Sequence, residues 1–175
     1  TRSMVKRASV LGIDVGGVII GADNDTTMFT KNYLEAQPVP GAFEAIRVLH
    51  ARFLGQIIIV SKAGPEMQDK TMHWMEQRDF WNATGMLKQG LGRHPDQNVF
   101  FCRERADKAP ICKRMNVTHF IDDRLDVLVH LTTVKKRFLF GSGGGRGKGW
   151  KDAMSHKAGI YKVADWPDVL ERVRP

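Results

Sequence analysis

The sequence contains few cysteines and no long hydrophobic segment. Its 175 residues include two cysteines, Cys102 and Cys112, which are too few for the disulfide framework of a small secreted domain. No apolar run approaches the roughly 20 residues that a membrane-spanning helix requires. The N-terminal stretch lacks the apolar core of a signal peptide, because Ser9, Gly12 and Asp14 interrupt it. We therefore expect a reduced, intracellular and cytoplasmic protein with no membrane partner, whose cysteines pack in the core.

Several recognition motifs are absent as well. No internal repeat is found, the cysteines and histidines show no metal-ligand spacing, and no RNA- or DNA-binding motif is present. The formal net charge of +8 favours anionic partners, which include phosphate esters, nucleotides and nucleic acid. A nucleic-acid partner therefore rests on charge alone, and the sequence leaves the oligomeric state open.

Strand-like and helix-like patterns alternate along a chain whose length predicts one domain over residues 1–175. Continuous apolar runs, such as residues 56–61, are typical of strands buried on both faces. The alternation predicts an α/β fold with a doubly wound, mostly parallel sheet in three layers. The expected strands are residues 9–14, 56–61, 98–102, 118–122, 136–140 and 159–163, and the expected helices are residues 41–53, 65–78, 107–115, 125–131 and 165–173.

Two basic segments have an ambiguous meaning. Residues 141–151 contain six glycines with Arg146, Lys148 and Lys151, which predicts a loop. This loop and residues 135–137 could follow a polyanion. We favour a solvated edge strand protected by lysines.

Polar side chains stand at the ends of three expected strands. In doubly wound sheets ligands bind outside the carboxyl ends of the strands, so Asp14, Ser61 and the Asp122–Asp123 pair are candidates for one site. Asp14 precedes Gly16 and Gly17, which allow a tight turn, and a carboxylate there can act as a nucleophile or simply form the turn.

The other candidates also have two readings. Ser61 with the following Lys62 could bind a phosphoryl group, or Ser61 could cap a helix. Lys108 begins an expected helix, where a cation is disfavoured by the helix dipole unless it neutralises an anion. Asp122 and Asp123 would repel each other without a cation, and Mg²⁺ is the natural one because it prefers oxygen ligands.

The order of these residues resembles the four motifs of the haloacid dehalogenase (HAD) superfamily over residues 9–140. The resemblance implies a Rossmann-like core of the HAD type. It further implies that Asp14 is the nucleophile that forms an aspartyl-phosphate, that Ser61 binds the phosphoryl group, and that Lys108 offsets the charge. Asp123, with Asp122 beside it, would hold Mg²⁺ together with Asp14 and the backbone carbonyl of Gly16.

Gly16 departs from the phosphatases of this family, which usually carry a second Asp at that position as the general acid and base. That help is worth roughly 10²–10⁴-fold in rate. Asp23 or Asp25 could supply the proton, or the leaving group could need none. A third reading is a weak or inactive module that binds phosphate.

The spacing of the motifs predicts a core with no cap domain or a minimal one. Asp14 and Ser61 are 47 positions apart, as are Ser61 and Lys108, and the expected elements use most of that length. Such members act on large substrates or use a partner subunit as a lid.

The function expected first is Mg²⁺-dependent hydrolysis of a phosphomonoester, either a small molecule or a larger polyanion, through an aspartyl-phosphate. A regulatory phosphate-binding module is the second candidate. A haloacid-dehalogenase-type hydrolase is the third, and the Asp122–Asp123 pair counts against it because those enzymes use no Mg²⁺.

Overall fold

The central feature of the computed structural model is a six-stranded parallel sheet. The model describes residues 8–21, 33–86, 98–141 and 159–175. The strands are β1 (Leu11–Ile13), β2 (Ile57–Lys62), β3 (Val99–Cys102), β4 (His119–Asp122), β5 (Lys136–Phe140) and β6 (Ile160–Val163). Their order is β3-β2-β1-β4-β5-β6, and every pairing is parallel. The predicted fold class is therefore confirmed.

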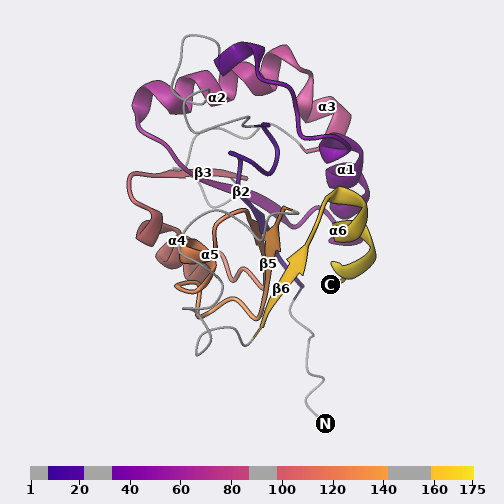
Figure 1. Ribbon diagram of the computed structural model, residues 1–175, viewed down its shortest axis with the longest axis vertical. Coiled ribbons are helices and arrows are strands. Elements are labelled where there is room, and N and C mark those ends of the chain that lie inside the picture. Colours follow the sequence, from indigo (N-terminus) through magenta and orange to yellow (C-terminus); the bar gives the residue numbers. More distant parts are fainter. Residues whose placement is uncertain (1–7, 22–32, 87–97, 142–158) are drawn as a thin grey trace.

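Helices cover both faces of this sheet (Figure 1). They are α1 (Ala42–Arg52), α2 (Pro65–Gln77), α3 (Phe80–Thr84), α4 (Lys108–Arg114), α5 (Leu125–Leu128) and α6 (Trp166–Arg172), with short 3-10 turns η2 (Tyr33–Glu35) and η3 (Arg105–Asp107). Buried residues of α1, α2, α3 and α6 form one apolar core with the sheet, and those of α4 and α5 form a second. The sheet and the helices on its two faces therefore form three layers.

Alternation along the strands divides the side chains between the two cores. Ile57 and Ile59 of β2 belong to the core under α1 and α2, whereas Ile58 and Val60 belong to the core under α4 and α5. This is the period of two that a strand imposes on its side chains. Both faces are covered, which explains why the strand sequences are continuous apolar runs.

Gly12, in the middle of β1, allows the neighbouring strand to place an aromatic ring against it. A Cβ at Gly12 would lie 2.4 Å from Cδ2 of Phe120 on β4, well inside van der Waals contact. The Phe120 ring therefore lies directly over the β1 backbone, in the core shared with α4 and α5.

The predicted elements agree with the structure except in several details. The sequence did not predict α3 or η2, and α5 ends at Leu128 rather than at Leu131. Asp107 precedes α4 as expected, but its carboxylate accepts from the Glu104 amide in a capping box of η3 and does not cap α4. The expected cap of α6 is confirmed, because the Asp165 carboxylate accepts from the Asp168 amide.

The prediction of a solvated edge strand at residues 135–137 is wrong. β5 lies between β4 and β6 inside the sheet, and Arg137 is buried, donating from Nη1 to the Leu128 carbonyl at 2.9 Å. Residues 142–158 of the predicted glycine-rich loop lie outside the described residues. Both cysteines are buried and free, as expected. Among the described helices, none is long and apolar enough to cross a membrane.

The buried His119 makes folding sensitive to acid. Burial, with the Lys136 ammonium nearby, lowers the pKa of His119 from 6.5 to about 4. The ring lies between Phe53 and Phe138, and its Nδ1 is 2.7 Å from the Thr118 hydroxyl. Between pH 4 and pH 6.5, His119 is therefore protonated in the unfolded state and neutral in the folded state. The stability contributed by the neutral ring is complete above pH 6.5 and is lost as the pH falls toward 4.

We therefore predict that the free energy of unfolding decreases by about 3 kcal/mol over this range because of His119 alone. Urea unfolding at pH 7, 6, 5 and 4 measures it. His119→Phe should show a shallower pH dependence than the wild type. Identical slopes in the two proteins would contradict this assignment.

Candidate functional site

The site lies where the sheet changes its direction of winding. β1 pairs with β2 on one side and with β4 on the other, so the chain leaves β1 in one direction and later returns past it to β4. Such a switch point opens a crevice at the carboxyl ends of the two strands. Ile13 pairs with Ile121, and the Asp14 amide donates to the Ile121 carbonyl at 3.0 Å. Asp14 and Asp122 therefore follow this last pair side by side.

A tight turn holds Asp14 in place. The carbonyl of Val15 accepts from the amides of Val18, Ile19 and Ile20 at 2.9–3.3 Å, and Gly17 adopts a φ of 77°. Trp166 of α6 donates from its indole to the Val18 carbonyl at 2.9 Å. These turn hydrogen bonds leave the N–H and carbonyl of Gly16 unused.

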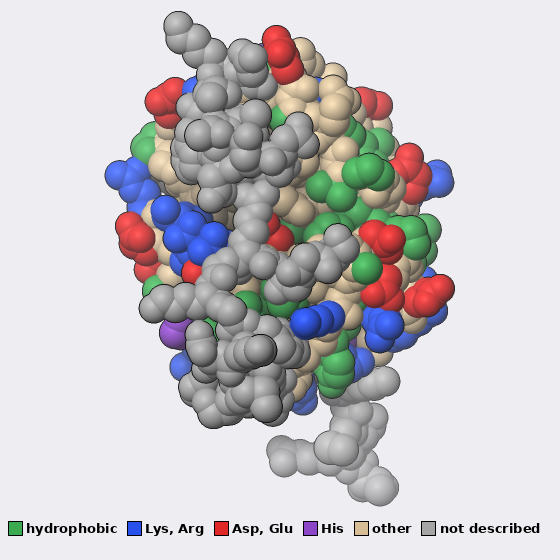
Figure 2. Space-filling view, in the orientation of Figure 1, with side chains coloured by type: hydrophobic (Ala, Val, Ile, Leu, Met, Phe, Trp, Pro, Cys, Tyr) green, Lys and Arg blue, Asp and Glu red, His purple; other side chains and the backbone are tan. Residues whose placement is uncertain are grey.

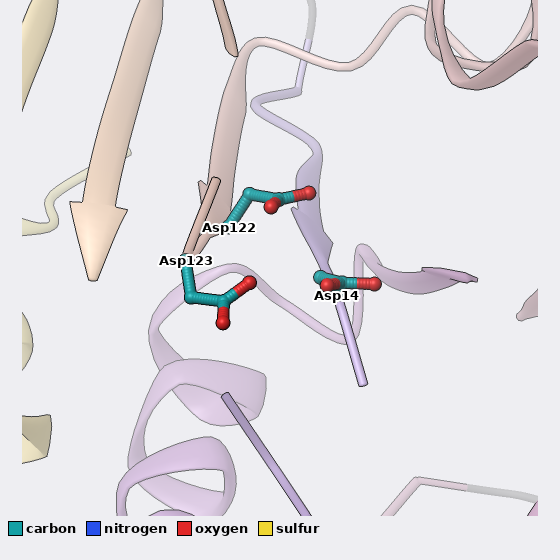
Figure 3. Close-up of side chains that lie close together, drawn as sticks. All are labelled: Asp14, Asp122 and Asp123. Atoms are coloured by element: carbon teal, nitrogen blue, oxygen red, sulfur yellow. The ribbon is translucent and has the colours of Figure 1, made fainter. Parts of the chain in front are cut away.

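Three carboxylates converge at this edge of the sheet (Figure 3). Asp14 reaches in from the end of β1, and Asp122 and Asp123 reach in from the end of β4. One oxygen from each lies within 4.8 Å of the others, and all three residues are buried. Asp14 and Asp122 lie on the sheet face covered by α4 and α5, as their position in the strand alternation requires.

Lys108 joins two of these carboxylates. Its ammonium lies 2.8 Å from Oδ1 of Asp14 and 2.8 Å from Oδ2 of Asp122, and its side chain is 3% exposed. The Lys108 ammonium also lies over the Phe120 ring, 5.6 Å from the ring centroid. Although Lys108 is the first residue of α4, where the helix dipole disfavours a cation, two buried anions offset that cost.

The pKa values show how strongly these charges depend on one another. Burial alone would lower the pKa of Lys108, but the carboxylates of Asp122 and Asp14 outweigh it and raise the pKa. Complete burial raises the pKa of Asp122, against the opposing effect of the Lys108 ammonium, and the Asp14 charge raises it further. The charges of Lys108, Asp14 and Asp122 are therefore coupled to one another.

The two adjacent acids have different surroundings. Asp122 uses one oxygen for Lys108 and the other for the Arg124 amide, at 2.8 and 2.9 Å. It is fully buried, whereas Asp123 is 6% exposed. Asp122 therefore holds the lysine, and Asp123 contributes the third carboxylate oxygen of the cluster.

The donor set fits a divalent cation of the magnesium type. Asp14 and Asp123 offer carboxylate oxygens, the carbonyl of Gly16 lies on the adjoining turn, and the cluster found among the described residues contains no sulfur or imidazole. Burial is the main cause of the raised pKa of Asp122, and the Asp14 and Asp123 charges, which such an ion would balance, add to it.

Ser61 and Lys62 stand on the neighbouring strand. Because Ile13 pairs with Ile59, Ser61 lies one residue beyond the level of Asp14. Ser61 is buried. Lys62 is the last residue of β2 and is exposed. Both reach the same edge of the sheet as the acids.

Asp23 and Asp25, the candidates for the general acid and base, lie outside the described residues. The sequence analysis also did not single out two arginines near the site. Arg124 follows the acid pair and forms a bidentate ion pair with Asp126, at 3.0 and 2.8 Å. Arg103 immediately follows β3. The rule that singled out Asp14 and Ser61, a polar residue at a strand's carboxyl end, would also have found both arginines.

Comparison with known proteins supports the fold. No family model matches the sequence, and no curated protein matches it. A solved structure from Burkholderia xenovorans LB400, described as a haloacid dehalogenase-like hydrolase, superimposes with a TM-score of 0.51 at 18% identity. The match covers 84% of this chain and 62% of that one, so the chain spans under two thirds of its length. At this identity the likeness establishes the fold.

Removal of Lys108 tests the charge balance of the site. In Lys108→Met the carboxylates of Asp14 and Asp122 remain buried without their cation, so we expect the free energy of unfolding to fall by about 3–5 kcal/mol in EDTA. Urea unfolding measures this loss. Adding Asp122→Asn to the variant removes one of the uncompensated charges, and the double variant should regain part of the loss. A Lys108→Met protein as stable as the wild type would contradict the ion-pair account.

Proposed function

We propose that this chain, which has the haloacid dehalogenase-like fold, is a Mg²⁺-dependent phosphomonoesterase that acts through an aspartyl-phosphate on Asp14. One observation carries the proposal. The Lys108 ammonium bridges the carboxylates of Asp14 and Asp122 at 2.8 Å each, while Asp123 stands beside them with an oxygen in the same cluster. A buried nucleophile, a fixed cation and a further anionic ligand are the parts that phosphoryl transfer needs.

Each residue has a separate task in this mechanism. Asp14 attacks phosphorus in line, and the bond to the leaving oxygen breaks as the bond to the Asp14 carboxylate forms. Lys108 holds Asp14 in position and offsets the charge on the phosphoryl oxygens, with Asp122 fixing the lysine. Ser61 donates its hydroxyl to one phosphoryl oxygen. Mg²⁺, held by Asp14, Asp123 and the Gly16 carbonyl, would balance the remaining negative charge.

The residue that handles the proton is the weakest part of the site. Gly16 offers no carboxylate, so the leaving group and the hydrolytic water depend on Asp23 or Asp25, or on a leaving group that needs no acid. This gap favours a second candidate function, a regulatory module that binds phosphate with little turnover. A dehalogenase is less well supported, because its chemistry uses no Mg²⁺ and gives no role to the adjacent Asp122–Asp123 pair.

We further propose one domain over residues 1–175 with no cap or a minimal one. α2 and α3 occupy about half of the length between Ser61 and β3. The substrate is a phosphorylated small molecule or a larger polyanion.

Hydrolysis of p-nitrophenyl phosphate tests the proposal. We expect turnover that requires Mg²⁺, is abolished by EDTA, and falls by roughly 10³-fold or more in Asp14→Asn, because the nucleophile is lost. Release of nitrophenolate measures it. Absence of turnover in the wild type, with Mg²⁺ still bound, would favour the regulatory module. Turnover that persists in Asp14→Asn would exclude Asp14 as the nucleophile.

The roles of the two adjacent acids are separable by metal binding. Mg²⁺ at 100 times its Kd should stabilise the wild type by about 2.7 kcal/mol, seen as a higher Tm than in EDTA. Asp123→Asn should abolish this shift, whereas Asp122→Asn should keep part of it, because Asp122 is committed to Lys108 and the Arg124 amide. Asp69→Asn, an exposed acid on α2, is the matched control. Loss of the shift in Asp122→Asn alone would reverse the assignment.

A further inference from the structure

Two cations stand at the carboxyl ends of adjacent strands beside the site. Lys62 is the last residue of β2 and pairs in register with Cys102, the last residue of β3. Arg103 follows Cys102 directly, and both cationic side chains are exposed. Neighbouring strands lie about 4.8 Å apart, so the two residues begin close together at the edge where the site opens.

The strand alternation places Lys62 on the sheet face that carries Asp14 and Lys108. Lys62 shares a face with Ile58 and Val60, whose core also contains Phe120 beneath Lys108. The charges of Lys108 and Lys62 both act on the thiol of Cys102. Burial raises the pKa of this thiol, and the two lysine charges oppose that rise. Lys62 is thus on the same side of the sheet as Asp14 and Lys108.

Arg103 reaches the loop that follows β2. A Cβ added to Gly64 would lie 3.9 Å from Nη1 of Arg103, so the guanidinium lies against this glycine, three residues after Ser61. Figure 2 shows Lys and Arg side chains gathered on the side of β3 and α4, next to acidic side chains at the centre of the same face. Arg103 therefore lies beside the loop that follows β2.

Among the described residues, these two cations differ from the partly exposed Arg124 and Lys70 in having no acidic partner. Arg124 pairs with Asp126, and Lys70 pairs with Glu66. Within the described parts of the chain, neither Lys62 nor Arg103 forms an ion pair or a side-chain hydrogen bond. One transferred phosphoryl group is already met by Lys108 and Ser61, so two further positive charges exceed what it requires.

We propose that Lys62 and Arg103 form a second anion subsite, which selects substrates carrying another phosphate or carboxylate near the phosphoryl group that is transferred. This inference rests on the proposed function for the identity of the first group. It narrows the substrate class from phosphomonoesters in general to those with two anionic groups, such as sugar bisphosphates or phosphorylated carboxylic acids.

Calorimetric binding to Asp14→Asn, which cannot form the aspartyl-phosphate, tests the subsite without turnover. The probes are two matched pairs: fructose 1,6-bisphosphate against fructose 6-phosphate, and 2,3-bisphosphoglycerate against 3-phosphoglycerate. We expect the bisphosphate to bind about tenfold more tightly in at least one pair, and the preference to shrink as salt is added. Wild type in EDTA repeats the measurement if Asp14→Asn does not fold.

Replacing the two cations with glutamine then tests whether they cause the preference for bisphosphates. Lys62→Gln/Arg103→Gln should abolish it, because the affinity for the bisphosphate falls about tenfold more than the affinity for the monophosphate. The control Arg47→Gln/Lys113→Gln removes the same charge from exposed positions on α1 and α4 and should keep it. Equal affinity within both pairs, or an equal loss for monophosphate and bisphosphate, would overturn the subsite. A preserved preference with no turnover of any phosphate ester would refute the phosphatase and retain the subsite.

Discussion

The ion pairs of Lys108 with Asp14 and Asp122 are the interaction on which the site depends. Each pair spans 2.8 Å between groups that are almost completely buried. Breaking such an arrangement costs several kcal/mol because it leaves charge without water or a partner. The three residues stand at the end of β1, in α4 and in β4, so the ion pairs join the two halves of the sheet across the switch point. The arrangement that positions the proposed nucleophile therefore also links these two halves.

The sheet makes this arrangement possible by sorting its side chains. The strand period of two places Asp14, Asp122 and Phe120 on the face covered by α4 and α5. Gly12 lets the Phe120 ring lie against the β1 backbone, and that ring supports the Lys108 ammonium. The position of the Lys108 charge therefore depends on packing at Gly12, because a side chain there would displace the Phe120 ring.

The adjacent acids divide two tasks that one carboxylate could not perform. Asp122 is saturated by Lys108 and the Arg124 amide, and its neighbour Asp123 supplies an oxygen to the carboxylate cluster. The site is built to concentrate negative charge on one side, and Lys62 and Arg103 border it with positive charge on the other. The anionic substrate and divalent cation proposed above are compatible with such a distribution of charge. The position held by Gly16 is where the chemistry departs from the phosphatase pattern.

The sequence alone determined the layered α/β fold, because buried parallel strands must be continuous apolar runs and the helices between them must have one apolar face. It also predicted one site, from Asp14, Ser61, Asp122 and Asp123 as polar residues at strand ends and from Lys108 as a cation at the start of a helix, and the structure brings Lys108 and the three acids together. It could not show that Lys108 reaches two carboxylates at once, that Asp122 and Asp123 differ in surroundings, or that Arg137 is buried. Those facts depend on strand order and register, which place residues more than 90 positions apart within hydrogen-bonding distance. Only the tertiary structure decides them, because the local sequence carries no record of which strands become neighbours.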